Sequence, residues 1–422
     1  MLLFSRGHLN DKLTDEDLKQ GLYTALDKLG PRKKVLAVPP DLTRLHSRAG
    51  ILTNLAWQYY RKILTDVLIA LGTHTPLTQA ELKQMFHETP LELFRQHNWR
   101  KDVTTLGEIP ADIVSKISEG RVNYSWPAQV NRLIAEGGFD LVLSIGQIVP
   151  HEVAGVANYN KNIFVGTGGP DAINKSHFLS AVLGIENMMG RINNPVRTVL
   201  DFASDNFAKN LPIVYVLTVV SADEDSALKT RGLFIGDDIE CFNLAAKLSL
   251  KVNIQILDRP LEKVVVYLDP AEYKSTWLGN KSIYRARMAV ADDGELIVLA
   301  PGVCRFGEDA QIDSLIKKYG YVGTDRILQS VEKNDDLKQN LSAAAHLIHG
   351  SSEGRFSIAY CPGKISRQEI ESVNFEYADL QQMLKKYNPR KLKDGVNVVG
   401  GEEIFFISNP GLGLWSWKEK FG

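Results

Sequence analysis

Three continuous apolar segments in the first half of the chain each lead into a polar loop. They read KKVLAVPPD, which ends at Asp41, TDVLIALGTH, which ends at His74, and FDLVLSIGQIVPHE, which ends near His151. Patterns typical of helices separate them, for example over Ala49 to Ile63 and after the capping-box pair Thr78 and Glu81. Continuous apolar strands between helices are typical of parallel strands covered on both faces. We therefore predict a mostly parallel sheet flanked by helices.

The pattern changes after about residue 250, where shorter strand-like segments begin. NIQILDRPLEKVVVYLDP predicts two paired strands joined by a polar turn, and GELIVLAP, FSIAYCPG and EEIFFISNP predict further strands. Helices are expected near Ala310 to Lys318 and near Tyr377 to Tyr387. The sequence thus predicts an α/β fold with a first domain over 1–255 and a smaller α/β domain over 256–405. The aromatic tail, 406–422, is expected to pack back on the first domain.

Composition and charge exclude several classes of protein. The formal net charge is -1, so a uniform basic field for nucleic acid or an anionic membrane is absent. The three cysteines, Cys241, Cys304 and Cys361, are far apart and form no C-x-x-C pair, which is typical of a reducing compartment. The first residues lack the apolar core of a signal peptide, and no apolar segment has membrane-spanning length. We expect a cytoplasmic protein that binds neither nucleic acid nor membranes.

Four polar residues, Asp41, Arg44, His74 and His151, lie just after predicted strands. Functional groups in parallel α/β sheets collect at the carboxyl ends of the strands. Polar residues also follow strands simply because loops are solvated. Four together, two of them histidines, favour a shared site over this ordinary explanation.

A glycine cluster at Gly166, Gly168 and Gly169 precedes a helix expected to begin near Pro170 or Asp171. Glycines let backbone amides approach a phosphate, and a helix N-terminus attracts anions. An ordinary tight turn has the same composition, so the cluster alone does not identify a binding site.

The strongest pattern joins these positions. Pro150-His151-Glu152-Val153-Ala154-Gly155 is followed ten residues after the histidine by Lys161, and sixteen residues later by His177. Upstream lie Asp41-Leu42-Thr43-Arg44 and Gly72-Thr73-His74. In order and spacing these elements resemble the nickel-dependent lactate racemase family, with its PHxxAG, D-x-T-R and G-x-H elements. The resemblance extends through most of the chain.

The resemblance implies a nickel-pincer nucleotide attached to Lys161, with the imidazole of His177 as a nickel ligand. Square-planar coordination of this kind suits Ni(II). It also implies that His74 and His151 exchange the hydroxyl proton of a 2-hydroxy acid while hydride passes to the cofactor and returns to the other face. Arg44 would bind the substrate carboxylate. Asp41 would orient Arg44 or a substrate hydroxyl, and the glycines would contact the nucleotide phosphate.

The match weakens in the second domain, where lactate racemases carry a Y-Q-x-x-K element. The corresponding stretch has Tyr284, but Arg285 replaces the glutamine and Met288 the lysine. Arg285 or Arg287 could supply the lost positive charge, although residues two apart on a helix point in different directions. We therefore expect a 2-hydroxy acid larger than lactate, such as a sugar acid. Enzymes that mature the cofactor are the expected protein partners, and the sequence is compatible with an oligomer.

Two other functions fit parts of the sequence. His74, His151 and His177 could form the zinc site of a hydrolase, although no H-E-x-x-H motif is present. A small-acid binding protein that has lost the cofactor is the other alternative, against which Lys161 and His177 both argue. We interpret the pair His346 and His349 as the end of a helix before Gly350 rather than as metal ligands, and Glu152 as a surface charge of its loop.

Overall fold

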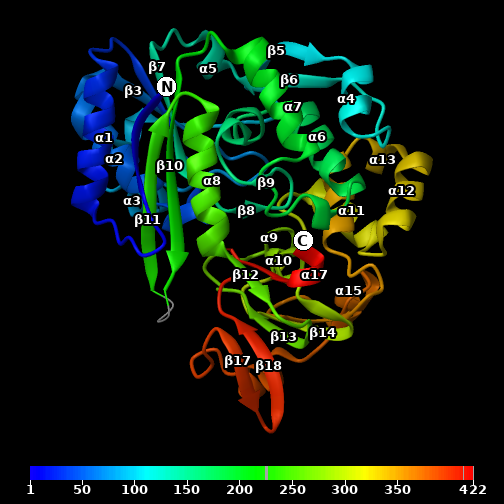
Figure 1. Ribbon diagram of the computed structural model, residues 1–422. Helices are drawn as coiled ribbons and strands as arrows, with labels where there is room; N and C mark the ends of the chain where they lie inside the picture. Colours follow the sequence, from blue (N-terminus) through cyan, green and yellow to red (C-terminus); the bar gives the residue numbers. More distant parts are fainter. Residues whose placement is uncertain (224–226, 412, 422) are drawn as a thin grey trace. The chain divides into compact units, whose positions relative to one another are not determined.

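The computed structural model describes residues 1–223, 227–411 and 413–421, and the chain divides into two compact units (Figure 1). The first unit consists of Met1–Leu179 and Met188–Asn253, and the second of Ser180–Asn187 and Ile254–Gly422. The later division, at Ile254, lies beside the change of pattern in the sequence. The short segment Ser180–Asn187, which belongs to the second unit although the first unit flanks it in sequence, was not predicted.

The first unit contains the predicted mostly parallel sheet, flanked by helices. Its seven strands follow the order β1-β11-β10-β7-β2-β3-β4. Neighbours from β10 to β4 are parallel, whereas β11 is antiparallel to both β10 and β1. The strands are β1 (Leu2–Gly7), β2 (Val35–Val38), β3 (Leu64–Ile69), β4 (Phe94–Gln96), β7 (Leu141–Gln147), β10 (Ile213–Ala222) and β11 (Leu228–Gly236). The prediction of an α/β fold with this sheet is confirmed.

The strand order reverses between β2 and β7. From β2 the chain builds outward through β3 and β4, then returns to the other side of β2 and continues through β7 to β10. The loops that leave the carboxyl ends of β2 and β7 therefore turn away from each other and leave space between them. Asp41 follows β2, and His151 follows β7, so two of the predicted site residues leave the sheet at this reversal.

Helices cover both faces of the sheet, as Figure 1 shows for α1, α2 and α3 on one side and α8 on the other. Buried leucines and alanines of α1 and α2 pack against β2, β3 and β7. Capping boxes at Thr14 and Asp17 and at Thr78 and Glu81 begin α1 and α3, so the predicted box at Thr78 is confirmed. The helices are α1 (Asp15–Leu29), α2 (Ala49–Tyr60), α3 (Gln79–Phe86), α4 (Ala111–Ile117), α5 (Arg132–Glu136), α6 (Pro170–Val182), α7 (Pro195–Ala203) and α8 (Ile239–Asn253).

Two small hairpins accompany this sheet. Antiparallel β5 (Val103–Ile109) and β6 (Trp126–Asn131) form one, and β8 (Pro150–His151) and β9 (Gly155–Val156) form the other. The second hairpin contains the PHxxAG element, so His151 belongs to a short paired strand and not to the end of β7.

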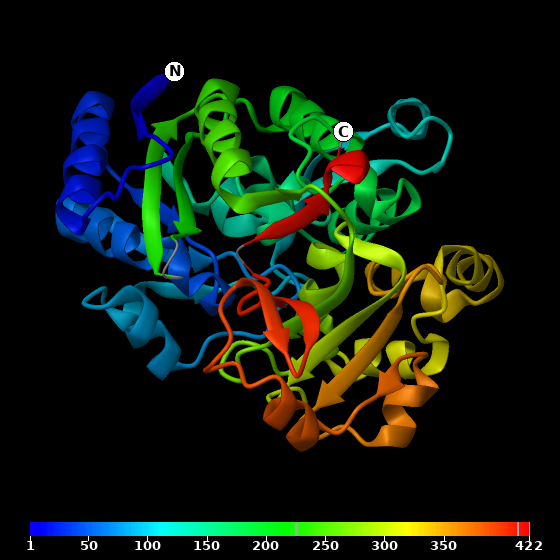
Figure 2. The ribbon, with the colours of Figure 1, turned by 60° about the horizontal axis from the view of Figure 1, so that its bottom comes forward.

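The second unit has its own parallel sheet, of order β16-β15-β14-β13-β18-β17, in which only β17 is antiparallel to its neighbour. Figure 2 brings these strands, coloured yellow-green to orange-red, to the front. A core of Val265, Ile297, Leu299 and Phe406 lies on one face and includes Leu380 and Tyr387 from the α16 region. The strands are β13 (Leu261–Tyr267), β14 (Val290–Ala300), β15 (Ser357–Pro362), β16 (Glu376–Tyr377), β17 (Gly395–Val399) and β18 (Glu402–Ile407).

One predicted pairing is wrong. The segment NIQIL forms β12 (Ile254–Leu257), which pairs with β19 (Leu414–Trp417) from the aromatic tail and not with β13. Because β12 and β13 are separated by only a short turn, their sequence pattern is that of a hairpin. It does not reveal that each strand joins a different sheet. The tail, expected on the first domain, thus contributes a strand to the second unit.

The helices of the second unit are mostly short, and two of them match predicted positions. They are α9 (Thr276–Gly279), α10 (Lys281–Ala286), α11 (Ala310–Tyr319), α12 (Thr324–Lys333), α13 (Asp335–Lys338), α14 (Leu341–His349), α15 (Arg367–Ser372), α16 (Leu380–Lys386) and α17 (Lys418–Phe421). Among residues 1–223, 227–411 and 413–421, no helix combines the length and apolar character needed to cross a bilayer.

A buried side chain joins β2 and β7 at the reversal of strand order. The Nδ2 of Asn162 donates to the carbonyl of Val38, at 3.0 Å, and to the hydroxyl of Ser144, at 3.1 Å. One amide group thereby donates a hydrogen bond to an acceptor in each of the two strands. These bonds fix the segment next to Lys161 against the sheet.

Replacing Asn162 by alanine should destabilise the protein. The variant leaves the buried acceptor of Val38 without this donor, so the free energy of unfolding should fall by about 1–3 kcal/mol, as measured by urea denaturation. Asn206→Ala is the matched control, because the Nδ2 of Asn206 donates to the carbonyl of Phe202 in an exposed position. Equal denaturation midpoints for the two variants would contradict the structural role of Asn162.

Candidate active site

Asp41 holds the imidazole of His74. Asp41 is 5% exposed and begins a 3₁₀ turn, Leu42–Ser47, in which its Oδ1 accepts from the amide and hydroxyl of Thr43. Its Oδ2 lies 2.5 Å from Nδ1 of His74. Because a carboxylate only accepts hydrogen bonds, the proton of neutral His74 is on Nδ1 and the lone pair is on Nε2. His74 is therefore oriented as a base, a role for Asp41 that the sequence had not suggested.

His151 has the opposite arrangement. It is 6% exposed, and its Nδ1 accepts from the amide of Val153 at 3.1 Å. Neutral His151 therefore carries its proton on Nε2, which can donate a hydrogen bond, and the protonated ring could act as an acid from the same nitrogen. Glu152 Oε2 lies 3.7 Å from the same Nδ1, and the Glu152 side chain is only 17% exposed. The interpretation of Glu152 as a surface charge is wrong, because the β8–β9 hairpin turns its carboxylate inward beside the imidazole.

Lys161 follows two residues in the left-handed conformation. Asn158 has φ of 62° and Tyr159 has φ of 58°, and the π-helical turn Asn162–Gly166 begins directly after the lysine. Such conformations are uncommon for residues other than glycine and are concentrated at functional sites. The backbone thus turns sharply on both sides of Lys161 and presents a partly buried amine.

Burial lowers the pKa of Lys161 to about 8. The positive charges of Arg44 and Arg197 lower it further, whereas the carboxylates of Glu152 and Asp41 oppose the shift. An amine with this pKa has a much larger neutral fraction near physiological pH than an ordinary lysine, and the neutral form can act as a nucleophile.

His177 lies on α6 with its ring fixed by the helix itself. Nδ1 donates to the carbonyl of Ile173, one turn earlier, at 2.7 Å, so Nε2 keeps its lone pair. Burial lowers the pKa of His177 to about 4, and the charge of Lys161 contributes to this shift. The imidazole is therefore neutral at ordinary pH, as a metal ligand must be.

The predicted residues of the first unit share one electrostatic environment. Asp41 and Arg44 act on the pKa of Lys161, and Lys161 and His74 act on that of His177. The His74 loop is also tied to the turn after Lys161, because the amide of Gly72 donates to the carbonyl of Gly166 at 2.8 Å.

The three glycines have packing roles. A Cβ on Gly168 would lie 2.0 Å from the carbonyl oxygen of Phe164, and one on Gly169 would lie 2.5 Å from Oε1 of Gln129. At Gly166 the nearest atom would be 3.0 Å away. Gln129 Oε1 also accepts from the amide of Ala172 in the first turn of α6. Close packing therefore accounts for these glycines, and their contact with a phosphate stays a prediction.

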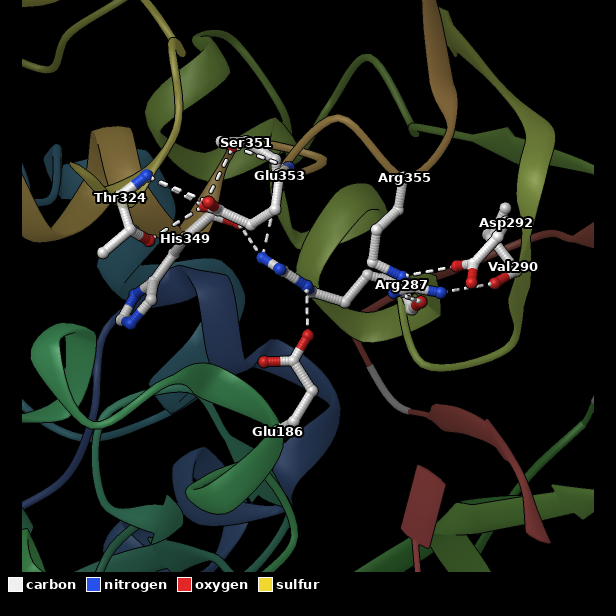
Figure 3. Close-up of polar contacts among 9 residues, drawn as sticks. All are labelled: Glu186, Arg287, Val290, Asp292, Thr324, His349, Ser351, Glu353 and Arg355. Atoms are coloured by element: carbon white, nitrogen blue, oxygen red, sulfur yellow. Dashed lines mark hydrogen bonds and ion pairs between the residues drawn. The ribbon is translucent and has the colours of Figure 1, made fainter. Parts of the chain in front are cut away.

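Tyr284 and Arg285 are buried on α10 of the second unit, and the Nη1 of Arg285 donates to the carbonyl of Gly413. Arg287 belongs to a structural network, shown in Figure 3. Its Nη1 donates to the carbonyls of His349 and Ser351, and its Nε lies 2.9 Å from Glu186. Of the two arginines considered for substrate recognition, Arg287 is thus held by other groups.

No three histidine, cysteine or carboxylate side chains converge as a metal site within the described residues. His74, His151 and His177, considered above as an alternative zinc site, do not form such a group there. His346 and His349 do lie at the end of α14, before Gly350, as interpreted from the sequence. His346 hydrogen-bonds the hydroxyl of Tyr321 and packs on Trp277.

Two residues that hold this site were missed in the sequence, Asn160 and Arg197. The side chain of Asn160 is fully buried next to Lys161 and bonds to the guanidinium of Arg197. The run of three asparagines around Lys161, in NYNKN, is the feature that could have drawn attention to this loop, because asparagine favours left-handed and turn conformations.

Comparison with protein families finds a match in the first half of the chain. Residues 23–189 match the model of the lactate racemase N-terminal domain. This part of the chain is therefore similar to a lactate racemase N-terminal domain. This stretch contains the D-x-T-R, G-x-H and PHxxAG elements, Lys161 and His177, so the resemblance predicted from the sequence is confirmed.

Solved structures extend the likeness to the whole chain. A crystal structure of a Thermotoga maritima protein, a structural genomics target, is 25% identical with a TM-score of 0.84, over 97% of this chain and 99% of that one. The lactate racemase apoprotein of Thermoanaerobacterium thermosaccharolyticum is 18% identical with a TM-score of 0.69, over 98% and 94%. A search of curated proteins found no match. The second unit therefore shares the lactate racemase fold as well.

The low pKa of Lys161 can be measured on the full chain. Acylation of Lys161 by an amine-directed reagent, followed by mass spectrometry, should rise with pH around a midpoint of about 8. Glu152→Gln removes a carboxylate that stabilises the ammonium, so its midpoint should move to lower pH. The exposed Lys62, read in the same digest, serves as the internal reference. An upward shift in Glu152→Gln would contradict the charge arrangement described here.

Proposed function

We propose that this protein is a racemase or epimerase that inverts the hydroxyl-bearing carbon of a 2-hydroxy acid. The observation that carries the proposal is the opposite proton placement on two histidines of the lactate racemase domain. Asp41 leaves the Nε2 of His74 as an acceptor, whereas the amide of Val153 leaves the Nε2 of His151 as a donor. Inversion of a carbinol carbon needs such a pair, because the hydroxyl proton leaves on one side and returns on the other.

The residues at Lys161 and His177 fit a nickel-pincer nucleotide. Covalent attachment needs a nucleophilic amine, which burial provides at Lys161. Completion of the nickel coordination needs one neutral imidazole nitrogen, which the bond from Nδ1 to Ile173 leaves on Nε2 of His177. When bound, this cofactor supplies the acceptance and return of hydride at the substrate carbon.

Side chains of this protein bind the substrate and transfer its hydroxyl proton. The guanidinium of Arg44 binds the substrate carboxylate through paired hydrogen bonds. His74 accepts the hydroxyl proton at Nε2, and the carboxylate of Asp41 stabilises the imidazolium that results. His151, in its protonated imidazolium form, donates its Nε2 proton to the oxo oxygen when that oxygen lies on the other face, and becomes neutral. After one turnover His74 is the imidazolium and His151 is neutral, so the reverse inversion begins with their roles interchanged.

We further propose that the substrate is larger than lactate and that Tyr284 and Arg285 contribute to its recognition. Arg285 adds a fixed positive charge and several donors where lactate racemases have a glutamine. A polyhydroxy acid offers acceptors for such a group, whereas lactate has no hydroxyl beyond C2. Cofactor maturation enzymes are the proposed protein partners.

Production of the full chain together with the cofactor maturation enzymes should add the cofactor mass to the peptide that contains Lys161. Lys161→Arg, which keeps a positive charge but cannot be acylated in the same way, should lack both the added mass and racemase activity. In heavy water, chiral 2-hydroxy acids should be inverted without deuterium at C2, because the migrating hydride does not exchange with solvent. Rapid deuterium incorporation at C2 would rule out the proposed reaction.

Asp41→Asn should impair proton transfer while leaving substrate binding largely intact. The amide of asparagine can donate to Nδ1 of His74 and shift its proton to Nε2, where the base is needed. We expect kcat to fall by roughly 10²–10⁴-fold with a smaller change in KM. Thr43→Val removes only the hydroxyl that supports the Asp41 carboxylate, so its effect should be much smaller. Equal losses in the two variants would show that Asp41 acts only through the local fold.

A further inference from the structure

Helix α7 turns one polar edge toward the two segments that carry His151 and Lys161. Asn194 caps the helix through Oδ1, and Arg197, Asp201 and Ser204 follow at spacings of three, four and three residues. Residues at these spacings share one side of a helix. The Arg197 side chain is only 2% exposed although it is charged, so its position needs an explanation beyond solubility.

The first segment on this edge is the hairpin that contains His151. The Nη2 of Arg197 donates to the carbonyls of Val156, at 2.8 Å, and Ala154, at 3.4 Å. The Nδ2 of Asn194 donates to the same Ala154 carbonyl at 3.1 Å. A Cβ on Gly155, which has φ of +74°, would lie 1.9 Å from the carbonyl oxygen of Arg191, so the hairpin packs directly against the segment that leads into α7.

The second segment is the loop that presents Lys161. The Nη1 of Arg197 donates to Oδ1 of Asn160. The Nδ2 of Asn160 donates to Asp201, at 2.6 Å, and to the hydroxyl of Ser204, at 3.2 Å. Both ends of the Asn160 amide are thus fixed by α7, one residue before the lysine. The left-handed residues Asn158 and Tyr159 precede it, and strained backbone of this kind persists only when its surroundings hold it.

We propose that Arg197 is a positioning residue that locks the His151 hairpin and the Lys161 loop into one mutual arrangement. One planar guanidinium bonds both segments at once, which a lysine or a neutral side chain could not do. The functional meaning of the two segments rests on the proposed racemase function, whereas the coupling between them does not.

The charge of Arg197 provides a second, independent link to Lys161. Burial lowers the pKa of Arg197 to about 10, while Asp201 supports its charged form. This buried positive charge is also one of the groups that lower the pKa of Lys161. Loss of the guanidinium should therefore change the titration of Lys161 as well as the rigidity of its loop.

Hydrogen–deuterium exchange on the full chain, made without maturation enzymes, tests the coupling. In Arg197→Met, backbone exchange should accelerate by at least about tenfold in both 150–156 and 158–164. Asn160→Ala, which leaves the bonds from Arg197 to the hairpin, should accelerate exchange in 158–164 alone. Arg231→Met is the matched control, because Arg231 is a buried arginine of the same unit that bonds Ser221 and the carbonyl of Asp11. It should leave both segments unchanged.

Acylation of Lys161 as a function of pH separates positioning from general stability. In Arg197→Met the midpoint of Lys161 acylation should move to higher pH. In Arg197→Lys, which retains the charge, this midpoint should stay near the wild-type value. In the control Arg231→Met it should be unchanged. If Arg197→Met does not fold, Arg197→Lys and Asn160→Ala still give the exchange test, with faster exchange expected in 158–164 in each. Unchanged exchange in both segments, or the same midpoint in the Met and Lys variants, would overturn the proposal. These measurements need no turnover, so they are independent of whether the protein is a racemase.

Discussion

The reversal of strand order between β2 and β7 is the constraint on which the candidate active site depends. The Asp41 loop follows β2 and the His151 hairpin follows β7, which are neighbouring strands at this reversal. The side chain of Asn162 bonds to both strands and so fixes the segment after Lys161 against them. Groups separated by more than a hundred residues in the sequence thereby come under one electrostatic influence. The fold supplies the location, and the polar contacts of a few buried side chains supply the orientation of each reactive group.

Burial acts on Lys161 and His177 in the same direction. Both are bases, and removal from water favours the neutral form of each, which is the form that the proposed nucleophile and the proposed metal ligand require. The two remaining histidines are instead controlled by hydrogen bonds to Nδ1, from a carboxylate in one case and a backbone amide in the other. Desolvation thus sets the charge of Lys161 and His177, whereas hydrogen bonds set the tautomers of His74 and His151.

The sequence was sufficient for the parallel sheet, because its continuous apolar strands and the capping box at Thr78 are local patterns. The spacing of the candidate site residues also matched a family motif, and their roles stay a prediction. The pairing of β12 with β19 joins segments about 160 residues apart, and nothing local encodes it. The Asp41–His74 contact, the inward Glu152 and the bonds of Arg197 depend on side-chain direction, which residue type and spacing do not determine.

The excursion Ser180–Asn187 means that the two units are not consecutive pieces of chain. Helix α6 begins in the first unit as the carrier of His177, and its last residues already belong to the second, where Glu186 pairs with Arg287. A gene truncated after Asn253 would encode Glu186 without this partner, and the remainder would keep a buried arginine without its carboxylate. Neither half therefore contains all the contacts of its own unit, so recombination at a single point could not exchange the second unit without disturbing the segment that directly follows the helix of His177.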